Sequence, residues 1–208
     1  MHVKFRSIPF LFAIPLFMSC ASNYKPIYPQ KLQYHNQSIN DNIEFSYHYD
    51  VLTESKNNRY AKHEIKNHLQ LVAVKITNLS GHDINPMNDA VFYIDKKAFY
   101  PVDQNLTGNK IKQGVPIYLL YLLMSPITLN TSTNTGYGKT NTSSFPIGLI
   151  FGPVISGFNM AIAGSANKHF RDELEKYSLD RQIQNGETIY ALVAFQDIGM
   201  DEITLRLK

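Results

Sequence analysis

Residues 43–51 read Ile-Glu-Phe-Ser-Tyr-His-Tyr-Asp-Val, in which apolar and polar side chains alternate without a break. A period of two puts the apolar side chains on one face of an extended chain, so this stretch predicts a β-strand with one buried and one solvent-facing side. Two further stretches are apolar on both faces, as central strands are. These are residues 69–77 (LQLVAVKIT) and 188–195 (TIYALVAF). Shorter strands are expected at residues 90–94, 98–102 and 203–207.

The order of these strands predicts an antiparallel fold. Turn signals follow or precede them, Asn-Leu-Ser-Gly at residues 78–81 and Asn-Gly at 185–186, and no strand alternates regularly with a helix. We therefore expect an α+β protein, mainly β, built on a small antiparallel sandwich that is immunoglobulin-like in architecture only. Residues 54–67, which are mostly charged or polar, are expected to form a loop or the end of a hairpin.

Between the two blocks of strands lies an unusually apolar segment. Residues 113–167 contain a single charge, Lys139. Two apolar runs, residues 115–129 and 145–163, flank a Thr-, Asn- and Ser-rich stretch that is expected to be a flexible tip. Apolar residues in and after the second run recur at steps of three and four and predict a helix over residues 154–177, with Pro153 near its start. The sequence thus predicts an apolar helical hairpin inserted into the sandwich at about residues 113–178.

Two interpretations of this hairpin follow from its small residues. Gly157, Ala161 and Ser165 recur every four residues, and such a stripe lets a second helix, here residues 117–124, approach closely. In the first interpretation, which we expect, the hairpin packs on its own sandwich or caps one end of it. In the second, residues 115–166 insert into a bilayer or dock on an integral membrane complex. The glycines and prolines of this region argue against a simple spanning helix.

The first twenty residues have the organisation of a secretory signal. Lys4 and Arg6 lie in a short basic start, an apolar run covers residues 8–18, and Ser19 precedes Cys20. The run is much shorter than the roughly 20 apolar residues that a helix needs to cross a bilayer. We therefore expect an address signal and not a transmembrane anchor.

The end of this signal, Phe17-Met18-Ser19-Cys20, resembles the lipobox of bacterial lipoproteins. The resemblance implies that residues 1–19 are removed and that Cys20 becomes the first mature residue, carrying a diacylglycerol and usually an additional acyl chain such as palmitate. The chain would then be held to a membrane by several acyl chains. The residues after Cys20, Ala21 and Ser22, include no acidic signal for retention or export. The resemblance therefore implies the outer membrane, with the protein facing the periplasm.

The polar residues 20–40 are expected to be the anchor and a tether, and residues 41–208 a single domain. This body has only a weak likeness to uncharacterised sandwich domains of secreted bacterial proteins. That likeness implies an architecture and no activity.

Motifs for chemistry are incomplete. A net charge of +3 does not indicate nucleic-acid binding. His63 and His68 are five residues apart, whereas two zinc ligands on one helical face are four apart. Residues 136–140, Gly-Tyr-Gly-Lys-Thr, imitate a phosphate-binding loop, but Thr133 stands where that loop needs glycine, so no nucleotide is expected. A single cysteine builds neither a disulfide nor a cysteine zinc site.

The sequence therefore predicts no catalytic, cofactor-binding or metal-binding residue, and Cys20 as the one modification site. The expected function is that of a non-catalytic, lipid-anchored cell-envelope protein, a binding or structural module that has an envelope protein as a possible partner. The alternative is a membrane-active component acting through the apolar hairpin. A hydrolase with a dispersed site stays open.

Overall fold

The computed structural model describes residues 20–34, 36–135 and 139–208. The predicted signal and the first part of the loop-like Gly-Tyr-Gly-Lys-Thr sequence, residues 136–138, lie outside the described residues. The chain forms two compact units. Unit 1 comprises Met1–Asn23 and Gly114–Ser165, and unit 2 comprises Tyr24–Gln113 and Ala166–Lys208. The inserted segment is therefore a compact unit in its own right.

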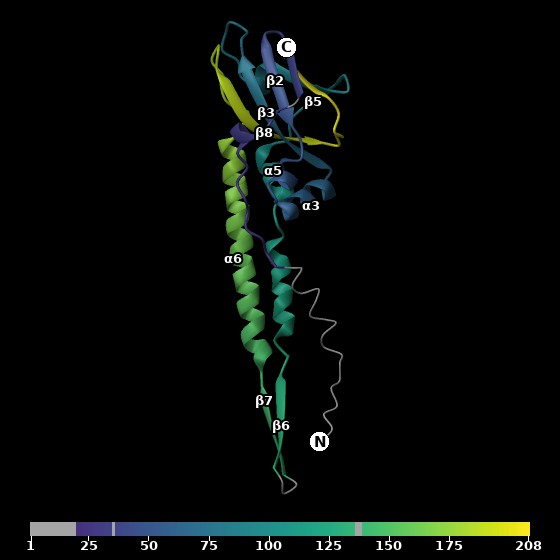
Figure 1. Cartoon of the computed structure of the whole chain (residues 1–208), viewed down its shortest axis with the longest axis vertical. Helices are drawn as coiled ribbons and strands as arrows, with labels where there is room; N and C mark the ends of the chain where they lie inside the picture. Colours follow the sequence, from purple (N-terminus) through teal and green to yellow (C-terminus); the bar gives the residue numbers. More distant parts are fainter. Residues whose placement is uncertain (1–19, 35, 136–138) are drawn as a thin grey trace. The chain divides into compact units, whose positions relative to one another are not determined.

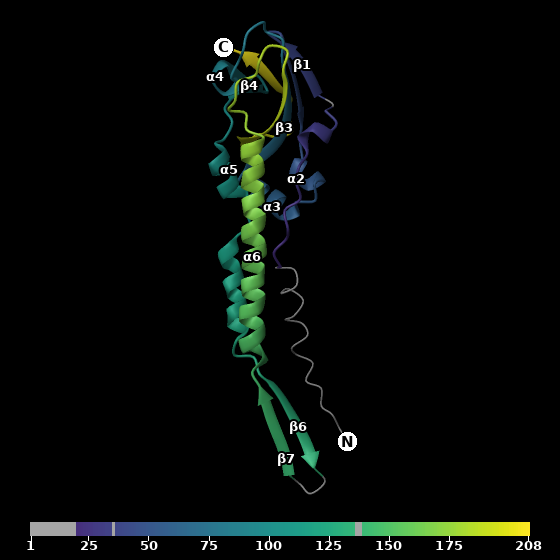
Figure 2. The same cartoon turned by 90° about the vertical axis from the view of Figure 1, so that its left-hand side faces the viewer.

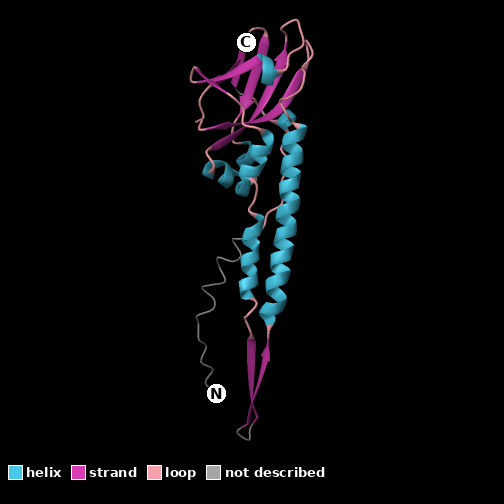
Figure 3. Cartoon of the chain, turned by 180° about the vertical axis from the view of Figure 1, so that it is seen from behind, coloured by secondary structure: helices cyan, strands magenta, loops and turns pink. Residues whose placement is uncertain are grey.

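Unit 2 contains two antiparallel sheets (Figures 1 and 3). The larger sheet has the order β1-β2-β3-β8 and consists of Asn36–Asn40, Ile43–His48, Leu69–Asn78 and Thr188–Gln196. The smaller sheet has the order β5-β4-β9 and consists of Lys97–Phe99, Ala90–Ile94 and Ile203–Leu207. The expected α+β class with antiparallel sheets is confirmed. Each predicted strand is present, but two are shorter than expected. The strand expected at residues 43–51 ends at His48, because Asp50 is in the left-handed conformation and a helix begins at Val51. The strand expected at residues 98–102 ends at Phe99.

A continuous apolar core lies between the two sheets. Phe45 on β2, Phe92 on β4 and Phe195 on β8 are all buried there. The ring of Phe92 is 5.9 Å from that of Phe45 and 5.2 Å from that of Phe195 between centroids, in edge-to-face geometry. The two-sided apolar patterns of β3 and β8 have a simple cause, because the larger sheet is covered on both faces.

Helices cover the other face of the larger sheet. Helix α3, Asn58–Lys66, contributes Tyr60 and Ala61 to a second buried cluster. The interpretation of residues 54–67 as a loop was therefore wrong. Four further helical segments of unit 2 are η1 Pro29–Lys31, α2 Val51–Glu54, α4 Pro86–Asp89 and α5 Gln104–Ile111.

The segment expected to be a free tether is part of this second cluster. Tyr24 is buried, the side chain of Ile27 is only 2% exposed, and β1 pairs with β2 over residues 36–40. Burying a large apolar side chain contributes about 1.5–3 kcal/mol, so the burial of Tyr24 and Ile27 favours an ordered segment. Residues 24–40 therefore belong to unit 2, and the expected boundary between a tether and a domain at residue 41 does not exist in the structure.

Unit 1 is a hairpin of helices extended by a hairpin of strands (Figure 2). In chain order its elements are the 3-10 helix η2 Val115–Met124, β6 Leu129–Thr135, β7 Lys139–Phe145 and the first part of α6 Ile147–Lys176. Helix α6 begins seven residues before the predicted start at residue 154, so Pro153 lies inside the helix. The expected flexible tip is a two-stranded antiparallel sheet in which Leu129 pairs with Phe145.

Candidate lipid-facing surface

The two helices of unit 1 contact each other through small and polar side chains. On α6 the buried stripe consists of Gly148, Gly152, Ser156, Asn159 and Ala163, at steps of three and four residues. In a soluble amphipathic helix this stripe holds the large apolar residues. Helix interfaces in membranes instead use small residues that let two backbones approach and polar residues that bond across the contact.

The glycines of this stripe allow an unusually close approach. A Cβ atom added to Gly148 would lie 1.9 Å from the backbone oxygen of Met124, and one added to Gly152 would lie 2.9 Å from that of Tyr121. The stripe expected from the sequence, which contains Gly157, is not the one used. A Cβ atom at Gly157 would have nothing within 4 Å. The spacing of four from Gly148 through Gly152 to Ser156 carried the same signal in the sequence.

Helix η2 faces α6 with every third residue, as a 3-10 helix with three residues per turn requires. Tyr118 and Tyr121 are buried, and both belong with Ala163 to a small cluster that Met160 and Ile155 flank. The remaining side chains of η2 are free to point elsewhere. The core of unit 1 is thus narrow and lies along one line of contact.

Many of the large apolar side chains of unit 1 are exposed. We define a candidate lipid-facing surface by the apolar side chains that are exposed on η2, α6 and the bases of the two strands, where Leu123 reaches 76% and Phe158 68% exposure. Its members are Ile117, Leu119, Leu120, Leu122, Leu123, Ile127, Leu129, Phe145, Leu149, Ile150, Phe151, Val154 and Phe158. Patches of this size are rare on soluble monomers and mark sites of interaction with proteins or membranes.

This surface surrounds the helices and is not confined to one stripe. Leu149, Ile150 and Phe151 are consecutive and all exposed, and consecutive residues of an α-helix are separated by about 100° around its axis. Helix α6 is also the one described helix that is long and apolar enough to cross a membrane, and only 28% of its apolar window is buried. The core helix of a soluble protein meets the same criteria of length and composition but is mostly buried.

The predicted lipidation site is attached to this hairpin. Cys20 is exposed. The next residue, Ala21, donates its backbone N–H to Asn159 Oδ1 at 2.7 Å and packs against the cluster of Tyr118, Tyr121 and Ala163. The Asn159 amide group donates in turn to the backbone oxygen of Ile155 at 2.8 Å. Both polar ends of this buried side chain are therefore satisfied.

The two ends of the insertion are tied together inside unit 2. Asn167 Oδ1 accepts a hydrogen bond from the backbone N–H of Gln113 at 2.8 Å, and Asn167 Nδ2 donates to the backbone oxygen of Gln113 at 2.9 Å. Tyr60 on α3 donates its hydroxyl to Asn167 Oδ1 at 3.2 Å and accepts from Gln113 Nε2 at 3.2 Å. This buried polar clasp fixes the points at which the chain leaves the sandwich and returns to it.

The histidines considered for metal binding have structural surroundings. His63 lies on α3, where burial and the nearby Lys66 lower its pKa. His68 follows that helix in a left-handed conformation, with Nδ1 3.8 Å from Asp197 Oδ1. Among the described residues, no group of three or more His, Cys, Asp or Glu side chains could hold a metal ion. The structure does not bring His63 and His68 into a common site.

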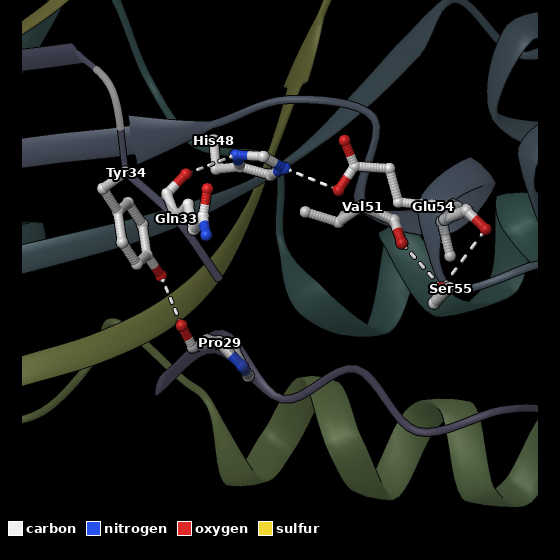
Figure 4. A network of polar contacts seen from close by, with 8 residues as sticks. Pro29, Gln33, Tyr34, His48, Val51, Glu54 and Ser55 are labelled. Carbon is white, nitrogen blue, oxygen red and sulfur yellow. Dashed lines mark hydrogen bonds and ion pairs between the residues drawn. The ribbon is translucent and has the colours of Figure 1, made fainter. Parts of the chain in front are cut away.

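His48, expected as a surface side chain, holds two segments together (Figure 4). Its Nδ1 lies 2.9 Å from the backbone oxygen of Gln33 and its Nε2 lies 2.7 Å from Glu54 Oε2. Tyr34 donates its hydroxyl to the backbone oxygen of Pro29 at 2.9 Å beside this contact. The segment expected from the sequence to be a tether is therefore bonded to β2 and α2.

No family model, no curated protein and no solved structure matches this chain.

Proposed function

We propose that this protein is a non-catalytic, lipid-anchored component of the bacterial cell envelope whose hairpin enters the bilayer beside the acyl chains on Cys20. The observation that carries the proposal is the inverted arrangement of α6. Glycine, serine and asparagine fill its buried stripe, while leucine, isoleucine and phenylalanine are exposed. In water this arrangement is unfavourable by about 25 cal/mol for each Å² of apolar surface left exposed. In hydrocarbon it is the arrangement expected of a helix interface.

A bilayer suits this surface better than the groove of a protein partner. A groove covers one stripe of a helix, as amphipathic helices show when they bind partners. Here Leu149, Ile150 and Phe151 expose apolar side chains in three directions, and η2 adds Leu119, Leu120 and others. Lipid covers such a surface on every side at once. The attachment of Ala21 to Asn159 supports the same partner, because it holds the acylated residue against the hairpin.

Unit 2 supports a structural or binding role in this proposal. Its sheets and helices build two buried apolar clusters, and its buried polar groups in the clasp bond to each other. We propose that unit 2 is the part presented to the aqueous compartment, which the resemblance to lipoproteins implies is the periplasm at the outer membrane. An envelope protein is the partner class proposed for it.

Membrane partition of a chain without acyl groups tests the proposal. The Cys20→Ala variant, secreted through a conventional cleavable signal, is expected to stay in the membrane pellet after carbonate extraction. It is also expected to bind protein-free vesicles of phosphatidylethanolamine and phosphatidylglycerol. Recovery in the soluble fraction would refute the proposal. Retention in cell membranes without binding to vesicles would also refute it and would indicate an integral membrane protein as the partner.

A glutamate substituted into the lipid-facing surface is compared with a glutamate substituted into unit 2. Adding Phe151→Glu to Cys20→Ala is expected to release the chain from vesicles, since an acidic side chain at the centre of a membrane helix is unfavourable by about 3 kcal/mol. The control is Met87→Glu, which alters an exposed apolar side chain of unit 2. This control is expected to leave membrane binding unchanged. Equal effects of the two substitutions would contradict the assignment of the surface.

A further inference from the structure

We propose that the hairpin of unit 1 crosses the bilayer, so that the end of β6 at Thr135 and the start of β7 at Lys139 lie on the side of the membrane opposite to Cys20. This inference rests on the proposed function, which places the lipid-facing surface in the bilayer. It adds the orientation of the hairpin and the depth to which the hairpin enters the bilayer. The protein would then be accessible from both sides of its membrane.

The position of Cys20 marks one end of the part of the hairpin that would lie in the bilayer. Ala21 is bonded to Asn159, and Asn159 directly follows Phe158, where the exposed apolar residues of α6 end. The acyl chains of Cys20 would therefore start at the level at which the lipid-facing surface starts. Val115, at the beginning of η2, directly follows Gly114, where the chain enters unit 1, whereas Met124 lies at the opposite end of η2.

The height of the surface matches one bilayer. A helix rises about 16 Å from Ile147 to Phe158 at about 1.5 Å per residue. Two extended residues from Ile147 to Phe145 add about 7 Å. The apolar surface is thus about 23 Å high, close to the band of about 25 Å that surrounds proteins spanning the outer membrane. A segment that lay flat at the interface would be apolar along one side only.

The junction between helices and strands, which would lie deep in this layer, has its backbone groups bonded. The backbone N–H of Ile127 donates to the oxygen of Met124 at 3.0 Å, and that of Gly148 donates to the oxygen of Ile127 at 2.9 Å. Irregular backbone persists at membrane depth only where protein satisfies its polar groups. The close approach at Gly148 is what makes the second of these bonds possible.

The part beyond the junction is polar and ends in a charge. After Leu129 and Phe145 the strands contain Thr, Asn and Ser, and Lys139 is the one charge in residues 113–167. Strands of this length reach about 24 Å. A lysine and a pair of open strand edges are both unfavourable in hydrocarbon, so the polar parts of β6 and β7 belong in water. These polar parts lie beyond the apolar surface as seen from Cys20. If the apolar surface fills the bilayer, they reach the aqueous compartment on the opposite side.

Two variants of the full acylated chain test the inference, and each has one cysteine added to Cys20. Ser132→Cys places a thiol on the exposed part of β6, and Gly114→Cys places one where nothing lies within 4 Å, next to Val115 at the Cys20 end. Cells are treated with a maleimide-linked poly(ethylene glycol) too large to cross a membrane or a porin, before and after permeabilisation. The wild-type chain, whose one thiol is acylated, is the blank.

Crossing predicts opposite patterns for the two thiols. One is expected to react in intact cells and the other only after permeabilisation, with at least a tenfold difference in labelled fraction at each site. Reaction of both thiols under the same condition would overturn the inference, and so would a Ser132→Cys thiol that stays unreactive until detergent dissolves the membrane. Carbonate extraction of the same samples separates the two failures, because release from the membrane refutes the proposed function, whereas a retained chain with same-side labelling refutes only the crossing.

Discussion

Substitution of Gly148 by alanine is expected to break the hairpin, whereas substitution of Gly157 is not. A Cβ atom at Gly148 would lie 1.9 Å from the Met124 oxygen, and real Cβ atoms approach backbone no closer than about 3.0 Å. The two segments must therefore separate by about 1 Å. Overpacking of this kind destabilises by about 1–3 kcal/mol. Loss of the bond from the Gly148 N–H to Ile127 adds about 1 kcal/mol.

Gly157→Ala is the control, because it adds the same methyl group at a position where nothing lies within 4 Å of the new Cβ atom. Replacing glycine in a helix interior by alanine stabilises the helix by up to about 1 kcal/mol. The two variants should therefore shift the unfolding midpoint of the acylated protein in detergent micelles in opposite directions. Far-ultraviolet circular dichroism during a denaturant titration measures both, and protease cleavage between η2 and α6 gives a second readout. A Gly148→Ala variant as stable as Gly157→Ala would refute the close approach and the interface built on it.

Two predictions concern unit 2. Burial raises the pKa of Glu64, which accepts the Leu71 N–H at 2.5 Å, to about 7. The protonated form therefore stabilises the fold below a pH of about 4.5, and this contribution, about 3 kcal/mol, is lost as the pH rises through about 7. Glu64→Gln keeps an acceptor for Leu71 and should flatten the dependence of unfolding free energy on pH, and an unchanged slope would exclude Glu64 as its source. Asn167→Ala removes the three hydrogen bonds that the Asn167 side chain makes in the clasp, so equilibrium unfolding should show a loss of about 2–4 kcal/mol. The exposed neighbour Lys168→Ala should change stability by less than about 0.5 kcal/mol, and similar losses at the two positions would show that the clasp contributes nothing.

The sheets could be predicted because their signal is local and strong. Alternation at Ile43, Phe45 and Tyr47 follows directly from the pleat of a strand with one buried face. Helix α3 could not be found in the same way. Its buried face is narrow, consists of Tyr60, Ala61 and Glu64, and includes a carboxyl group that a hydrophobic pattern counts as solvent-facing.

The helical hairpin shows a different limit of sequence interpretation. Its helix over residues 154–177 was predicted because apolar residues recur at helical spacing, and the same rule places the large apolar residues inside. The structure places Gly148 and Ser156 inside and Phe151 outside. The spacing of apolar residues in the sequence shows only that the two faces of a helix differ in composition. Which face is buried depends on the solvent around it, and a bilayer reverses the assignment that water would give.

The clasp between Gln113 and Asn167 has a consequence for how such a chain can arise. Because the two residues are hydrogen-bonded to each other, residues 114–166 form one insertion whose two ends are held together. The entropy lost in closing a loop grows only with the logarithm of its length, about 0.6 kcal/mol for each doubling. A fold of two antiparallel sheets can therefore carry a long apolar insertion between two bonded residues while its strands keep their pairing.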